Sequence, residues 1–69
     1  MPINFANLGD EVVIKRVGGS PEIKKHLEDL GFVVGGVVTV VSKTGGNIIV
    51  KIKESRIAIS SEMARKIMI

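Results

Sequence analysis

The sequence predicts a mostly β fold, a small and strongly bent barrel of about five short antiparallel strands. One α-helix is inserted near residues 21–30, and a short helical turn is expected near 61–66. Apolar residues alternate with polar ones over short runs, as in half-buried strands. Turn-forming residues separate these runs, and 69 residues are too few for a two-sheet sandwich. We therefore expect a single domain, residues 1–69, with one core.

The first strand is expected over Glu11–Val17. Successive side chains of a strand point to opposite faces, so Val12 and Ile14 should share a buried face. Val13 and Val17 should share the other face.

The segment that follows carries the signals of a short helix. Ser20 can cap its N-terminus, Pro21 suits the first helical position, and Gly31 suits the C-terminal stop. At helical spacing one apolar stripe forms, consisting of Ile23, Leu27 and Leu30. The helix should lie with this stripe on the body of the domain.

The second half of the chain is predicted to be a meander of strands. Residues 37–43 and 48–54 should form a hairpin around a four-residue loop, 44–47. A tight turn near Glu54-Ser55 should lead into a strand over 56–60, with Ile57 and Ile59 inward. Residues 67–69 should close the barrel by pairing with the first strand, which protects sheet edges.

Composition excludes several classes of protein. Without cysteine there can be no disulfide and no thiolate metal site. No uncharged run approaches the length of a membrane crossing, and the N-terminus lacks the pattern of a secretion signal. We expect a cytoplasmic protein without direct membrane insertion.

The formal net charge of +3 raises the question of nucleic-acid binding, since basic side chains neutralise phosphates. Single-strand binders also use aromatic rings as stacking platforms. Here Phe5 and Phe32 are the only aromatic residues. A nucleic-acid-binding barrel is therefore a further alternative that the composition disfavours.

No pattern indicates catalysis. There is no cysteine nucleophile, and no spacing suggests a buried carboxylate pair or a serine partnered by histidine. Gly18-Gly19-Ser20 precedes a helix, but it lacks the Gly-Lys-Ser/Thr continuation of a phosphate-binding loop. We interpret it as a strand-to-helix turn and expect a protein that is not an enzyme.

The order of these parts resembles the FeoA family (ferrous iron transport protein A) over essentially the whole chain. The most specific element is the Leu-x-x-Leu-Gly-aromatic/aliphatic-x-x-Gly run, Leu27 to Gly35. The other segments that carry the resemblance are Asn7 to Glu11, Gly18-Gly19, Arg56 to Ile59 and Ala64 to Ile69. The chain is also similar to the SH3-like C-terminal domain of iron-dependent repressors. In contrast to the usual family pattern, no glycine stands near Ser55.

The resemblance implies an SH3-like barrel in the cytoplasm that assists a FeoB-type ferrous iron transporter. It implies docking on the transporter's cytoplasmic GTP-binding domain, which would recruit the protein to the inner face of the membrane. No cofactor is required for such a role.

The candidate partner-binding residues lie on and after the helix. They are Lys24, Lys25, Phe32, Val33 and Val34. An extended segment cannot direct three successive apolar side chains into one core, so at least one of the last three should be exposed. It would then contribute to a protein-docking patch.

A second hypothesis is a divalent-metal sensor or carrier. Glu22, His26 and Asp29 are spaced i, i+4, i+7 along one side of the helix, and carboxylates and imidazole are ligands for Fe²⁺ and other divalent transition metals. A metal ion bound there would be held weakly, at a site open to solvent. The alternative is a solvated polar flank.

A basic patch is expected on the outward side of the strands, formed by Lys15, Lys51, Lys53 and Arg56. Such a patch could speed docking on an acidic partner. The alternative is a set of solvated charges that keep the strands soluble.

Overall fold

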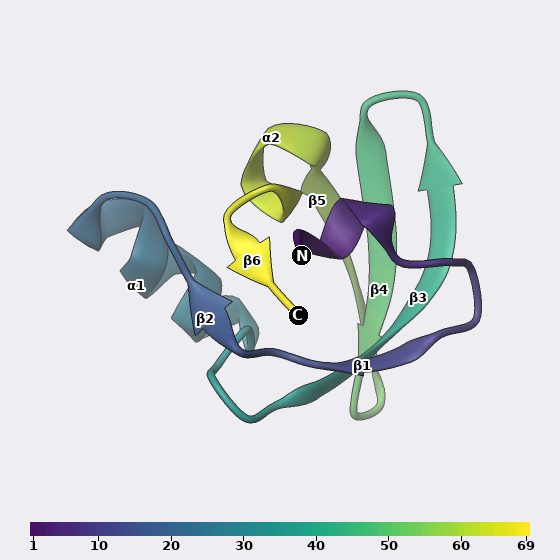
Figure 1. Cartoon of the computed structure of the whole chain (residues 1–69), viewed down its shortest axis with the longest axis horizontal. Helices are drawn as coiled ribbons and strands as arrows, with labels where there is room; N and C mark the ends of the chain where they lie inside the picture. The colour runs from purple at the N-terminus through teal and green to yellow at the C-terminus, as the bar shows by residue number, and fades with distance from the viewer.

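The computed structural model describes all residues, 1–69, and has six strands and three helical segments (Figure 1). In chain order these are the 3-10 helix η1 (Ile3–Phe5), β1 (Glu11–Val13), β2 (Arg16–Val17), α1 (Pro21–Leu30), β3 (Val37–Thr44), β4 (Asn47–Ile52), β5 (Ser55–Ser60), α2 (Ser61–Ala64) and β6 (Ile67–Met68). The mostly β prediction is confirmed.

Four strands form one antiparallel sheet in the order β1-β3-β4-β5. Val12 is paired with Val38, and Val40 with Val50, and their side chains face inward because alternate residues share a face. The next row along the sheet points outward. It consists of Glu11, Thr39, Lys51 and Arg56, one residue from each strand.

The predicted first strand, Glu11–Val17, is wrong as one continuous element. It divides into β1 and β2 at Ile14, whose N–H donates to Gly36 and whose carbonyl accepts from Gly35. The next N–H, that of Lys15, donates to Met68 at 2.7 Å. The chain thus changes hydrogen-bonding partners at this bend, and Val17 becomes buried with Ile14 rather than facing outward with Val13.

The bend lets the chain close on itself. β2 pairs antiparallel with β6, Arg16 opposite Met68 and Val17 opposite Ile67. The N-terminal segment covers the other side of β6, where Pro2 bridges Met68. The predicted pairing of the last strand with the first is confirmed. A four-stranded sheet and a two-stranded sheet curve round one core, as in an SH3-like barrel.

Helix α1 has the expected caps. The Ser20 hydroxyl accepts from the N–H of Ile23 at 3.4 Å, and Gly31 has a φ of 108°. The Gly31 N–H donates to Glu28 and the Phe32 N–H to Leu27, which is the Schellman arrangement. Leu27 is fully buried, and Ile23 and Leu30 pack against the core, so the predicted stripe is confirmed.

Turn lengths differ from the expectation. Thr44 pairs with Asn47, so the first hairpin turns through two glycines rather than four residues. The second turn consists of Lys53 and Glu54, because Ile52 pairs with Ser55. Lys53 has a φ of 55°, in the left-handed region that side-chain-bearing residues avoid. The predicted helical turn 61–66 is shorter, since α2 ends at Ala64.

The core consists of apolar side chains alone, and no polar or charged residue is buried. Thirteen residues form it, with Phe32 the largest of those that are fully buried. Ile48 and Val50 face inward from β4, and Ile57 and Ile59 face inward from β5 as predicted. No helix combines the length and the apolar character that a bilayer crossing requires.

Candidate functional site

An open groove of about 800 Å³ lies beside the C-terminal end of α1. Asp29 and Leu30 line it from the helix, and Ile52 and Ile57 from the β4–β5 hairpin. Val33 extends the lining into the segment between α1 and β3. The groove therefore joins the helix end, the hairpin and the start of β3 in one concave surface with both apolar and charged walls.

Four exposed valines gather near this groove, and we call them the valine patch: Val13, Val33, Val34 and Val37. Val13 and Val37 are paired across β1 and β3. Val33 packs beside Gly36, the residue before Val37, and its carbonyl accepts from the Gly36 N–H at 2.9 Å. The exposed fractions run from 45% for Val33 to 67% for Val34. Clustered apolar exposure of this kind is typical of an interaction surface.

The placement of Phe32 contradicts its assignment as a partner-binding residue. Its side chain has no exposed area, because the Schellman turn directs it inward beside Leu27. Val33 and Val34 are both exposed, as expected when a segment of successive apolar residues cannot bury them all. Of the three, only these two can contact a partner.

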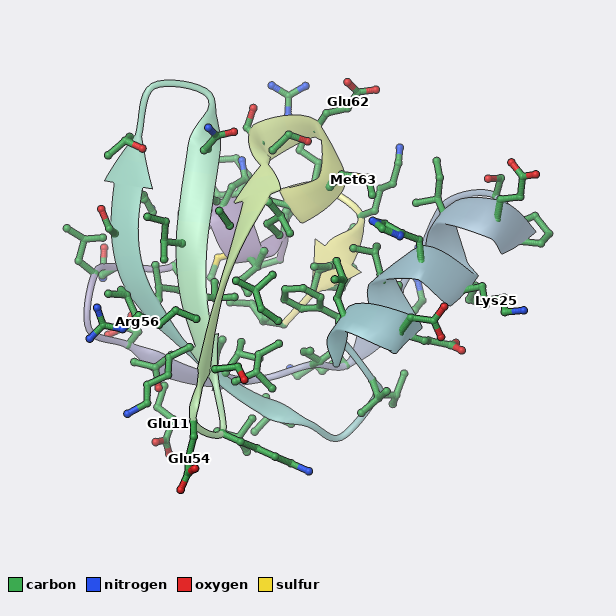
Figure 2. The ribbon with its side chains drawn as sticks, turned by 180° about the vertical axis from the view of Figure 1, so that it is seen from behind. Glu11, Lys25, Glu54, Arg56, Glu62 and Met63 are labelled. Carbon is green, nitrogen blue, oxygen red and sulfur yellow. The ribbon has the colours of Figure 1, made fainter.

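The other predicted partner residues, Lys24 and Lys25, are exposed on α1. Figure 2 shows Lys25 pointing away from the sheet, on the outer side of the helix. Both lysines are therefore accessible to a partner, but neither lines the groove.

The predicted metal ligands do not assemble into a site. Glu22, His26 and Asp29 are all exposed on α1, and no group of three or more His, Cys, Asp or Glu side chains is placed to hold a metal ion. The row spacing brings neighbouring side chains within reach of each other but leaves the first and last about two turns apart. The donor set of this helix therefore does not fit a metal centre.

The predicted basic patch forms only in part. Lys51 and Arg56 are directly opposite each other on the outer face of the sheet, and Lys53 follows in the turn. Lys15 lies beyond the bend at Ile14, where its N–H bonds to Met68, so it does not join that row. Figure 2 shows Glu11 and Arg56 toward the same end of the sheet.

Sequence reasoning missed Val13 and Val37 as members of the exposed patch. Both stand in runs of successive valine and isoleucine residues, where alternation shows that half the side chains must face outward. The register that sets them opposite each other depends on residues 24 positions apart, which the sequence pattern does not specify.

The FeoA domain family matches residues 1–69, the whole chain. A protein of Methanocaldococcus jannaschii assigned as an Fe(2+) transport protein A is 32% identical over 68 residues, which cover 99% of this chain and 83% of that protein.

Solved structures agree with this match. FeoA of Stenotrophomonas maltophilia, crystallised with zinc and described as a procaryotic SH3 domain protein, has a TM-score of 0.85 at 26% identity, covering 99% of this chain and 87% of that one. A manganese-dependent transcriptional repressor has a TM-score of 0.88 at 18% identity, covering 97% of this chain and 39% of that one, and shows the shared fold. The chain therefore belongs to the FeoA domain family, which is implicated in ferrous iron transport.

Proposed function

We propose that this protein is a cytoplasmic accessory or regulatory protein of ferrous iron uptake. It docks on the cytoplasmic GTP-binding domain of a FeoB-type transporter and acts by binding rather than by catalysis. The partner holds it at the inner face of the membrane.

The observation that carries this proposal is the valine patch beside the groove. Its four valines are 45–67% exposed, so their apolar side chains are in contact with water. Docking would remove that area from water at about 25 cal/mol per Å². The polar groups around it, Asp29 and Lys53 among them, could give orientation to a partner, since charged rims favour specificity and encounter rate.

Binding rather than chemistry is supported by the nature of the site. The core holds no polar or charged side chain, whereas catalytic groups are commonly desolvated and positioned by neighbours. Three side-chain hydrogen bonds join a polar side chain to the backbone three residues away, at helix caps and in a loop. A fourth joins Lys43 Nζ in β3 to the Asn4 carbonyl oxygen in η1. All four have a backbone group as partner, so they support the fold rather than position one functional side chain against another.

The test is a calorimetric titration of this protein into the purified GTP-binding domain of the cognate transporter. We expect saturable binding with a stoichiometry near one. No binding at tens of micromolar protein in low salt would refute the proposal.

A further inference from the structure

Strand β5 forms an edge of the four-stranded sheet, since its only neighbour is β4. The other edge, β1, is three residues long, whereas β5 has six. None of the backbone hydrogen bonds made outside strands and helices involves residues 55–59. One side of β5 is therefore an unpaired strand edge.

The turn before β5 determines which groups face that edge. In a two-residue hairpin the residues flanking the turn, here Ile52 and Ser55, form a close hydrogen-bonded pair, and such pairs then alternate along the ladder. Arg56 and Ala58 therefore direct both N–H and carbonyl groups away from β4. Both residues are exposed.

This edge has few of the features that usually prevent pairing with another chain. Those features are proline, a bulge, charged side chains, a very short strand, or a helix or loop that covers the edge. β5 contains no proline, and its register with β4 runs without a shift from Ser55 to Ser60. Arg56 is its one charged residue. An extended segment could therefore add to β5 without rearrangement of the sheet.

The groove lies against the same edge. Ser55 and Ile57 of β5 line it, with Leu30 of α1 and the following Gly31 also in its walls. An added strand would direct alternate side chains toward the core side and the outer side. An apolar residue suits the core side beside Ile57, and the outer side lies next to Arg56.

The charges beside the free edge of β5 indicate which kind of segment would bind there. The outward row runs from Glu11 at the β1 edge to Lys51 and Arg56 at the β5 edge, so two like charges are directly opposite each other next to the free edge. Such pairs are unfavourable, and a carboxylate on the next strand would give an opposite-charge neighbour. A second copy of β5 supplies no carboxylate.

We propose that the free edge of β5 binds an extended segment of a partner protein by strand addition. The segment carries a Glu or Asp next to Arg56 between apolar residues. This inference goes beyond docking through the valine patch and does not require the transporter.

The test uses a capped peptide of sequence Thr-Val-Glu-Val-Glu-Val-Thr and a matched peptide with Lys in place of Glu. Amide hydrogen exchange of the ¹⁵N-labelled protein should slow at Arg56 and Ala58 with the Glu peptide. Because one opposite-charge cross-strand pair contributes up to about 1 kcal/mol, the Lys peptide should bind about fivefold more weakly. A Glu peptide with N-methylated backbone should give no protection, since it cannot complete the ladder.

Arg56→Glu provides the decisive variant. In this variant Lys51 is opposite a glutamate instead of an arginine, so folding should be retained. Because the charge next to the free edge is then negative, the variant should bind the Lys peptide more tightly than the Glu peptide. Unchanged exchange at Arg56 and Ala58 in peptide excess would overturn the proposal. So would equal binding of both peptides. If sedimentation shows that the protein self-associates and that Arg56→Glu abolishes this association, the edge binds a second copy of the chain instead.

Discussion

The backbone N–H of Phe32 donates a 2.9 Å hydrogen bond to the carbonyl oxygen of Leu27, and neither side chain has exposed area. This bond ends α1 and directs the chain so that Phe32 enters the core while Val33 and Val34 remain exposed. One local arrangement therefore connects the most specific sequence run of the chain to its candidate docking surface.

Gly31→Ala should destabilise the protein by about 1–2 kcal/mol, because the left-handed backbone region costs that much for a residue with a Cβ. The φ of 108° is the source of the cost, since the nearest atoms to a new Cβ, on Ile52, lie at an ordinary 3.4 Å. Urea denaturation measures the change. Gly46→Ala, with open space around it and no positive φ, is the control and should change stability by less than about 0.5 kcal/mol.

Phe32→Ala should cost about 3–5 kcal/mol through loss of buried contacts and the cavity left behind. Val34→Ala should change stability by less than about 0.5 kcal/mol, because the valine is 67% exposed. Thermal unfolding followed by circular dichroism compares the two variants. Equal losses would contradict the assignment of Phe32 to the core.

Val34→Asp should weaken docking on the transporter's GTP-binding domain by at least about tenfold, since a charge would be desolvated in an apolar contact. Leu8→Asp is the matched control: Leu8 is 59% exposed but lies outside the valine patch, and its change should leave affinity within about twofold. Calorimetric titration with both variants, each confirmed as folded, measures this. Similar losses in the two would remove the valine patch from the interface.

Lys53→Gly should raise the free energy of unfolding by about 1 kcal/mol, because glycine adopts a positive φ without the strain that lysine bears at 55°. For a domain of this size that corresponds to an increase of about 4–8 °C in Tm. Differential scanning calorimetry checks it. A decrease in Tm would indicate that the Lys53 side chain stabilises this turn by more than its positive φ destabilises it.

Zn²⁺ or Mn²⁺ at about 100 μM should leave the Tm unchanged, because ligand stabilisation requires a site occupied in the folded state. Glu22, His26 and Asp29 do not form one. A rise in Tm that disappears in His26→Ala, with Lys25→Ala as a control on the same helix, would restore the metal hypothesis.

Much of the fold was predictable because its signals are local. Ser20, Pro21 and Gly31 define α1 through hydrogen bonds within a few residues, and alternation along β4 and β5 identifies their buried face. The groove was not predictable. Leu30 and Ile57, which line it together, are distant in sequence, and only packing of the helix end against the hairpin brings them to one surface.

The sequence by itself determined the mostly β class, the helix with its caps, part of the core, including Ile14, Leu27 and Ile59, and the resemblance to the FeoA family. The tertiary structure decided where the first strand divides and which of Phe32, Val33 and Val34 faces solvent. It also set Lys51 opposite Arg56 next to a free strand edge. These features depend on strand register and on bonds such as that from Lys15 to Met68. Such contacts form between distant residues, and no local pattern encodes them.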